Sequence, residues 1–385
     1  MRVAIPLSLY VHLPWCVRKC PYCDFNSHQL GARSAKPPRG YIDALLDDFD
    51  TELPLLAGSR IETVFFGGGT PSLFDPADFA HLLGGLRQRI EFAADAEITL
   101  EANPGTIERG RFSGYRDAGI NRVSLGAQTF AAEALEQLGR IHSPDDTLRA
   151  VDELRAAKLE NFNLDLMYAL PQQTVAAACA DVAAACALGP AHISYYQLTL
   201  EPGTVFHARP PQLPDEDSAW IMQTEGQSLL AAAGYRQYEV SAYAKAGAQC
   251  RHNVNYWLFG DYVGIGAGAH GKLSLDLPDH ILRTVKPRQP LEYQKALAGA
   301  KSAVGERLLV DREQLPFEFM LNALRLNDGF AAADFRGRTG MDLSVIADRL
   351  DAQQTRGLIE PWRGGWRATE LGRRFLNDLQ AGFLA

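Results

Sequence analysis

The sequence predicts an α/β fold in which a partial (β/α)6 barrel precedes a smaller, mostly helical domain. Two observations predict the barrel. Strand-like and helix-like segments alternate from residue 7 to about residue 240, and most of the strands are continuous apolar runs. Repeated strand–helix units imply a parallel sheet, and continuous apolar runs imply strands that are covered on both faces. A third observation, the changed order of elements after residue 305, predicts the second domain.

The barrel elements follow one another regularly along the chain. The predicted strands occupy residues 8–13, 62–67, 97–102, 121–126, 161–168, 192–200 and 235–241. The helical segments carry apolar residues at three- and four-residue spacing and occupy residues 41–56, 77–90, 131–138, 145–157 and 216–233. Of the seven predicted strand segments, six are main strands of the sheet. Six strands are fewer than the eight of a closed barrel, so we expect the barrel to be incomplete.

The C-terminal part has the element order of a winged helix. We expect helices at 311–326, 331–336 and 343–356, a hairpin at 358–369 around Gly364-Gly365, and a last helix at 370–379. Residues 306–385 contain 11 Arg and 12 acidic residues. A DNA-reading module would be basic, so a protein-contact or lid module is favoured. The chain then divides into a barrel at 1–245, a Gly-rich connecting region at 246–305 and a winged-helix-like domain at 306–385. Within the connecting region we expect 260–271 to form a backbone-packing loop that lines the barrel mouth.

Composition excludes several classes of protein. The net charge of −8 argues against nucleic acid or an anionic membrane surface as the main partner. No apolar run reaches the ~18–20 residues of a membrane span. Six cysteines in 385 residues are unlike a disulfide framework. Cys179 and Cys186 lie in an Ala-rich segment that reads as a buried helix. We therefore expect a cytoplasmic protein, while peripheral membrane contact and homo-oligomer formation stay open.

Three cysteines form the sharpest motif. Cys16, Cys20 and Cys23 lie on one short loop directly after the first strand. Three thiolates suit either zinc or an iron–sulfur cluster. A structural zinc site needs a fourth ligand, which His12 or His28 could supply. A cubane cluster on three cysteines instead leaves one iron open to a small molecule.

Polar residues also stand at the ends of the following strands. Gly68, Gly69 and Thr70 follow the second strand, and glycines let backbone groups approach a ligand closely. The later strands and loops add Glu101, Gln128, Arg140 and Asp165. Each of these could be a cap or one member of a buried ion pair. Their convergence at the carboxyl ends of successive strands favours a binding site.

These motifs resemble the family of oxygen-independent coproporphyrinogen III dehydrogenase and its relatives, which are radical S-adenosylmethionine (SAM) proteins. The resemblance covers the whole chain and rests on five blocks in order, YVHLPWCVRKCPYCDFNSH, FFGGGTPS, EANPGT, RVSLGAQTF and NLDLMYALPQQT. It implies a radical SAM partial barrel with a [4Fe-4S] cluster on Cys16, Cys20 and Cys23. It also implies S-adenosylmethionine contacts at Tyr10, Tyr22, Gly68, Gly69, Thr70, Glu101, Gln128, Arg140 and Asp165.

Two departures favour the heme-chaperone branch of the family. The dehydrogenase has a further Cys where this chain has Phe25, and a longer N-terminal arm. An H-N-x-x-Y-W block implies heme contacts at His252, Tyr256 and Trp257, and Cys250 and His270 are further candidates. Imidazole is the commonest protein ligand of heme iron, and aromatic rings pack against a porphyrin. Without the resemblance, His252 would read as a hydrogen-bonded core histidine.

The sequence therefore predicts a heme chaperone that binds heme, a [4Fe-4S] cluster and S-adenosylmethionine. Its expected partners are client hemoproteins, chiefly respiratory ones. The alternative is the dehydrogenase itself, which decarboxylates coproporphyrinogen III to protoporphyrinogen IX, although we do not expect that activity. A second alternative is a zinc-stabilised binding module. Catalytic residues are not assigned.

Overall fold

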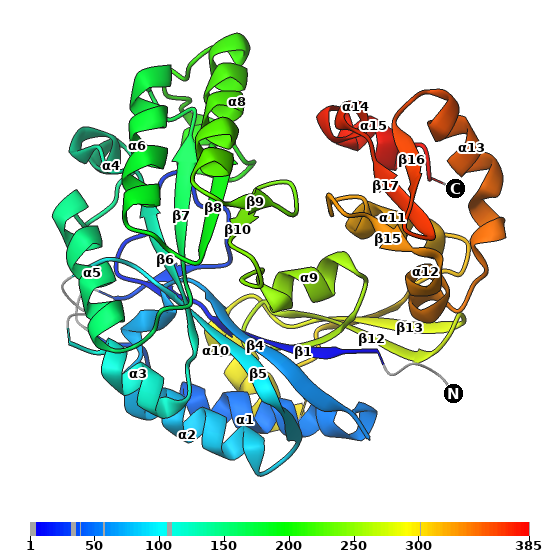
Figure 1. Ribbon diagram of the computed structural model, residues 1–385. Coiled ribbons are helices and arrows are strands. Elements are labelled where there is room, and N and C mark those ends of the chain that lie inside the picture. Colours follow the sequence, from blue (N-terminus) through cyan, green and yellow to red (C-terminus); the bar gives the residue numbers. More distant parts are fainter. Residues whose placement is uncertain are drawn as a thin grey trace.

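The computed structural model describes residues 5–31, 36–38, 40–56, 58–105, 110–300 and 302–384. Its main feature is a curved twelve-stranded sheet in the order β14-β13-β12-β11-β1-β4-β5-β6-β7-β8-β10-β9. The helices of the N-terminal half cover its outer face, and the C-terminal domain stands beside the open edge of the barrel (Figure 1). The predicted α/β class is confirmed.

Six parallel strands form the partial barrel, as the sequence predicts. They are β1 (Leu7–Leu13), β4 (Arg60–Gly68), β5 (Glu91–Ala102), β6 (Arg122–Gln128), β7 (Phe162–Tyr168) and β8 (His192–Gln197). All residues of β6 are buried, because side chains fill the barrel on one face and helices cover the other. The carboxyl ends of these strands consequently meet at one rim, where the site lies.

The helices that follow these strands pack mostly outside the sheet. They are α1 (Tyr41–Glu52), α2 (Pro76–Arg87), α3 (Phe112–Ala118), α4 (Ala132–Gln137), α5 (Pro144–Ala156), α6 (Val175–Ala187), α7 (Val205–Ala208) and α8 (Glu216–Ala232). Phe206 of the short α7 instead packs against Tyr22 of the cysteine loop. Short 3-10 turns lie at Leu53–Leu55 and Pro71–Leu73. Cys179 and Cys186 lie on α6 and are half-buried, so they are less enclosed than the sequence suggests. None of the described helices has the length and apolar character needed to cross a membrane.

Two segments differ from the sequence-based expectation. The Gly-rich segment 260–271, expected to be a loop, contains β11 (Asp261–Ile265) and the start of β12 (His270–Asp276). Glycine hides the strand pattern here because it permits close backbone approach: a Cβ on Gly264 would lie 2.1 Å from the carbonyl oxygen of His270. The expected strand at 235–241 is instead the short β9 (Arg236–Gln237), which turns back into β10 (Ala242–Ala244).

The connecting region extends the main sheet. β11 pairs in parallel with β1, and β12, β13 (His280–Val285) and β14 (Glu306–Leu309) follow as antiparallel strands. Two helices belong to this region, α9 (Arg251–Trp257) and α10 (Pro290–Ala300). The sheet therefore continues past the barrel and forms a wall beneath the C-terminal domain (Figure 1).

The C-terminal domain has the predicted order of helices, hairpin and helix. Its elements are α11 (Leu315–Ala323), β15 (Phe330–Ala331), α12 (Ala332–Thr339), η3 (Leu343–Ile346), α13 (Ala347–Thr355), β16 (Ile359–Trp362), β17 (Gly365–Ala368), α14 (Glu370–Arg374) and α15 (Leu376–Ala381). The three strands form a small sheet in the order β15-β17-β16. Phe319 is fully buried and centres a separate apolar core, so the domain has a core of its own.

Candidate functional site: two adjoining cavities at the barrel rim

The three cysteines lie on the loop that follows β1. Cys16 ends the short strand β2 (Trp15–Cys16), which pairs with β3 (His28–Gln29), and the backbone N–H of Cys23 donates to the carbonyl of Cys20 at 3.2 Å. Cys16 is buried, while Cys20 and Cys23 are half-buried. Burial raises the pKa of the Cys16 and Cys23 thiols. The loop therefore presents three thiols from one compact turn.

Polar groups lie near each cysteine sulfur. The Thr70 hydroxyl lies 3.5 Å from the Cys16 sulfur, Arg140 Nη1 lies 3.8 Å from the Cys20 sulfur, and the Ser27 hydroxyl lies 3.9 Å from the Cys23 sulfur. Donors near sulfur favour the thiolate form that an iron–sulfur cluster needs. The hydrogen bonds to Thr70 and Ser27 therefore offset part of the effect of burial on the pKa of Cys16 and Cys23.

A cavity of about 140 Å³ opens directly beside this loop, and we call it the cluster cavity. It brings together most of the residues that the sequence analysis selected for the cluster and S-adenosylmethionine. Those that line it are Cys16, Cys20, Tyr22, Cys23, Gly69, Thr70, Glu101, Gln128, Arg140 and Asp165. The residues from β4 to β6 lie at or just after the strand ends, as the strand-end argument predicts, whereas Asp165 lies in the middle of β7 and Arg140 lies between α4 and α5.

The glycines after β4 are required by close backbone packing. Gly68 has a φ of 113°, and a Cβ there would lie 2.6 Å from the His12 ring. A Cβ on Gly69 would lie 2.5 Å from the carbonyl oxygen of Trp15. Any side chain would push this turn away from the cysteine loop. The turn thus holds the floor of the cluster cavity against the residues that carry the thiols.

Two half-buried carboxylates face this cavity. Burial, and then the charge of Asp165, raise the pKa of Glu101 to about 8, although the Gly68 N–H donates to Glu101 at 3.3 Å. Burial also raises the pKa of Asp165, which Asn163 and Ser124 contact at 2.8 and 3.1 Å. Neither acid forms an ion pair within the described residues, although the charge of Arg122 partly offsets the effect of burial on Asp165. A cationic ligand would relieve the remaining cost of the two acids. S-adenosylmethionine carries an ammonium and a sulfonium group, so it fits a cavity lined by these two carboxylates.

The structure adds cavity residues that the sequence analysis did not select. Arg140 donates to the side-chain oxygen of Asn103 at 2.5 Å and to the carbonyl of Gly126 at 2.8 Å. The Tyr196 hydroxyl donates to Gln128 at 2.9 Å. Asn103 directly follows β5 and Tyr196 lies near the end of β8, so the strand-end pattern could have identified both. These contacts orient Arg140 and Gln128 within the cavity.

A larger cavity of about 900 Å³ adjoins the first. Phe25 and Glu101 line both cavities, so these two side chains form the boundary between them. The larger cavity contains the remaining predicted residues, Tyr10, Gly68, His252, Tyr256 and Trp257. Its volume is within the ~300–1,000 Å³ typical of small-molecule sites.

His252 projects from α9 into a hydrogen-bonded setting at this cavity. Its Nδ1 lies 2.8 Å from the Thr63 hydroxyl, and its Nε2 lies 3.2 Å from the Tyr256 hydroxyl. Burial lowers its pKa to about 3, so the imidazole is neutral at physiological pH. The Cys250 sulfur instead contacts Glu97 at 3.7 Å and does not line the cavity, so the candidacy of Cys250 as a heme contact is not supported. His270 does line it.

The residues fit an iron–sulfur cluster better than a single zinc ion. A zinc ion holds thiolates about 2.3 Å away, which requires them to converge closely. Within the described residues, no group of three His, Cys, Asp or Glu side chains converges in this way. Both ring nitrogens of His12 are engaged, with the Tyr10 hydroxyl at 3.0 Å and the Asn26 carbonyl at 2.8 Å. A cubane cluster binds each thiolate to a different iron, so it does not require that convergence.

Family models match both parts of the chain. Residues 10–180 match the Radical SAM superfamily, and residues 310–375 match the HemN C-terminal domain. The fold agrees with the crystal structure of coproporphyrinogen III oxidase (HemN) from Escherichia coli, with a TM-score of 0.83, 23% identity, and coverage of 99% of this chain and 90% of that one. The fold and the cysteine site therefore define a radical SAM protein.

Sequence comparison shows to which family of radical SAM proteins the chain belongs. The chain is 48% identical to the heme chaperone HemW of Escherichia coli (strain K12) over 381 residues, 99% of this chain and 98% of that protein. It is 45% identical to the heme chaperone HemW of Haemophilus influenzae over 383 residues, 98% of each. This protein belongs to the heme chaperone HemW family.

Proposed function

We propose that this protein is a heme chaperone that binds heme in the larger cavity and transfers it to client hemoproteins. The observation that carries the proposal is His252, a neutral imidazole at the wall of a cavity of about 900 Å³. The cluster cavity next to it would hold a [4Fe-4S] cluster on Cys16, Cys20 and Cys23, with S-adenosylmethionine against its open iron. Bound there, the pair supplies one-electron reductive cleavage of the sulfonium.

The hydrogen bonds around His252 favour one tautomer. Thr63 donates its hydroxyl proton to Ser8 at 2.8 Å, so the Thr63 oxygen is left to accept from Nδ1 of His252. A proton on Nδ1 leaves the lone pair on Nε2, where it accepts from the Tyr256 hydroxyl. A metal-binding imidazole commonly has its other nitrogen fixed as a donor in this way. Displacing the Tyr256 hydroxyl would free Nε2 for heme iron.

Aromatic side chains supply the flat apolar surface that a porphyrin needs. Phe65 lies 5.0 Å from the His252 ring, and the Tyr256 and Tyr262 rings lie 4.4 Å apart, all of them at the larger cavity. Trp257 lines the same cavity. Such rings bury large apolar area and favour flat aromatic ligands. We therefore assign Tyr256 and Trp257 to heme contact, together with His252.

The chaperone role is also supported by the relatives, which are named heme chaperones. We place the protein in the cytoplasm and take respiratory hemoproteins as its clients. Phe25 stands at the boundary of the two cavities, where the dehydrogenase branch has a cysteine, so we do not assign coproporphyrinogen III dehydrogenase activity.

A heme titration tests the proposal. Cluster-reconstituted protein is titrated with heme under anaerobic conditions while the Soret band is recorded. For the wild type we expect saturation near one heme per chain. His252→Ala should give a shifted and weakened Soret band. His207→Ala is the control and should give the wild-type spectrum, because its exposed imidazole lines neither cavity. An identical shift in wild type and His252→Ala would exclude His252 as the ligand, and the absence of any shift would exclude heme binding.

A transfer assay tests the chaperone step itself. Heme-loaded protein is mixed with the apo form of a respiratory b-type cytochrome, and formation of the holo-cytochrome is followed. Delivery should be faster than from free heme at equal concentration. Equal rates would contradict the chaperone role, and formation of protoporphyrinogen IX from coproporphyrinogen III in a parallel assay would favour the dehydrogenase.

A further inference from the structure

One wall of the larger cavity is the antiparallel sheet β12–β13–β14. His270, Val285 and Glu306 lie opposite one another across these strands, and Lys272 lies opposite Arg283 two residues farther along. All five line the cavity. Residues directly opposite in an antiparallel sheet project from the same face. This wall therefore presents to the cavity two cations, Lys272 and Arg283, together with His270 and the carboxylate of Glu306.

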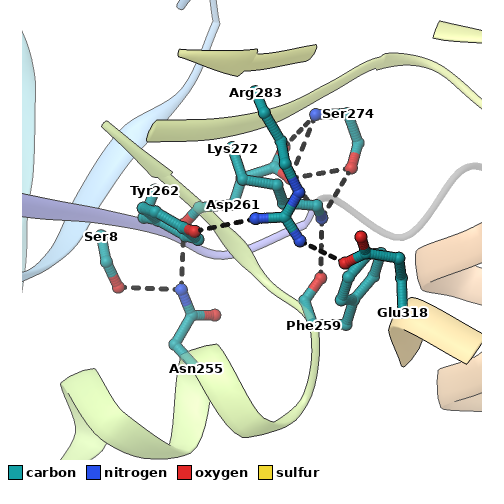
Figure 2. A network of polar contacts seen from close by, with 9 residues as sticks. All are labelled: Ser8, Asn255, Phe259, Asp261, Tyr262, Lys272, Ser274, Arg283 and Glu318. Carbon is teal, nitrogen blue, oxygen red and sulfur yellow. Dashed lines mark hydrogen bonds and ion pairs between the residues drawn. The ribbon is translucent and has the colours of Figure 1, made fainter. Parts of the chain in front are cut away.

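The positive charge of Lys272 is already paired with a carboxylate within the wall. Its ammonium lies 3.0 Å from Asp261, 3.0 Å from the Ser274 hydroxyl and 2.9 Å from the carbonyl of Phe259, whose ring it also covers at 4.0 Å (Figure 2). Its side chain is 1% exposed. The three N–H groups of this ammonium each have an oxygen partner, so Lys272 stabilises the wall and has no donor left for a ligand.

Arg283 already binds a carboxylate. Its Nη2 forms an ion pair with Glu318 of α11, and its Nη1 lies 3.4 Å from the Tyr262 hydroxyl (Figure 2). Its Nε–H has no hydrogen-bond partner among the described residues. This Nε–H is buried, so a ligand carboxylate would have to reach Arg283 at its Nη groups, next to the Glu318 carboxylate of the C-terminal domain. Glu318 occupies the place that a ligand carboxylate could take.

Arg288 is the cation of this wall without an ionic partner in the described part of the chain. Its side chain is exposed and lines the cavity, and no carboxylate lies within ion-pair distance of it there. Its backbone is fixed, because the Asn26 side-chain amide donates to its carbonyl at 2.9 Å and His28 Nε2 lies 3.2 Å from the same oxygen. Burial, and then the charges of Arg283 and Arg288, lower the pKa of His270, while the charge of Glu306 raises it, so these groups share one area.

We propose that Arg288 and Arg283 form a carboxylate subsite that binds the propionate groups of the porphyrin. This proposal rests on the proposed heme binding. The subsite would fix the orientation of the porphyrin ring in the cavity, which iron ligation alone does not fix. A porphyrin carries its anionic groups on flexible arms at one edge, and guanidinium groups bind carboxylates through paired hydrogen bonds. Arg288 offers an unpaired guanidinium, and Arg283 becomes available when Glu318 moves aside.

Comparing heme with its dimethyl ester tests the subsite, because the ester keeps the ring and the iron but loses both negative charges. Affinities are measured by anaerobic absorbance titration of cluster-reconstituted protein. Wild type should bind heme about tenfold more tightly than the diester, as expected for one net charge-assisted contact. Arg288→Gln should lose about tenfold for heme and nothing for the diester. Arg288→Lys should fall in between.

Two further variants sharpen the result. Glu318→Gln removes the competing carboxylate from Arg283 and should tighten heme binding severalfold without changing diester binding. Arg209→Gln changes an exposed arginine that lines neither cavity and should behave as wild type. Equal losses of affinity for heme and for the diester in Arg288→Gln would show that Arg288 has a structural role, and would overturn the subsite. A wild type that binds heme and the diester equally tightly would also overturn it. A wild type that binds neither form would overturn the proposed function itself.

Discussion

The imidazole Nδ1 of His252 lies 2.8 Å from the hydroxyl of Thr63, and this contact determines which ring nitrogen faces the larger cavity. Thr63 is on β4 inside the barrel, whereas His252 is on α9, 189 residues later. The contact therefore joins the barrel to the segment that carries the predicted heme block.

Removing this contact should weaken heme binding. Thr63→Val keeps the shape of the buried side chain but removes the oxygen that accepts from Nδ1. Changes to the groups that orient a metal ligand typically cost 10–100-fold in affinity, so we expect a dissociation constant for heme raised about tenfold and an altered Soret band. Thr355→Val, at an exposed position of α13, is the control. An unchanged constant and spectrum would contradict the orienting role.

The cluster should depend on the loop cysteines and not on the others. Cys20→Ser leaves two thiolates, so reconstituted protein should lose most of its bound iron and sulfide and its brown colour. Cys179→Ser, on the outer helix α6, should retain about four irons per chain. Iron and sulfide analysis after anaerobic reconstitution measures both. Full iron content in Cys20→Ser would show that the cluster is bound elsewhere.

The acid pair in the cluster cavity should make stability depend on pH. Burial and Asp165 raise the pKa of Glu101 from 4.5 to about 8, so between these values the native state keeps a proton that the unfolded chain releases. The free energy of unfolding should therefore fall as pH rises through this window, by at most about 1.4 kcal/mol per pH unit from this group. Glu101→Gln should reduce that slope between pH 6.5 and 8.

Urea unfolding of wild type and Glu101→Gln without S-adenosylmethionine measures this difference. Since the histidines contribute equally to both proteins, the comparison isolates Glu101. Parallel pH profiles would show that Glu101 does not titrate in this range.

A buried ion triad should stabilise the junction between barrel and connecting region. Lys286 lies 2.6 Å from Asp48 and 2.6 Å from Glu52, and all three side chains are at most 2% exposed. Lys286→Met leaves two buried carboxylates without a cation, which should cost about 3–5 kcal/mol in the free energy of unfolding. Arg312→Gln, which removes an ion pair 60% exposed on both sides, should leave the urea midpoint unchanged. Equal midpoints for all three proteins would contradict a structural role for the triad.

The sequence predicted the cluster cavity well because its residues follow local rules. The cysteines are close in sequence, and Glu101 and Gln128 end strands that a parallel sheet brings to one rim. The wall made by β12–β14 was not predicted. Glycines conceal β11 and the start of β12, and β11 pairs with β1 across about 250 residues, which no local pattern reveals. Arg283 and Arg288 become candidates only once that pairing is known.

The electron paramagnetic resonance spectrum of the reduced, reconstituted protein tests the central claim most directly, since it reports on the iron that the cysteines leave open. A [4Fe-4S] signal should be present and should change when S-adenosylmethionine is added, because the molecule binds that iron. A signal that stays the same after the addition, or protein that acquires no cluster at all, would contradict the account.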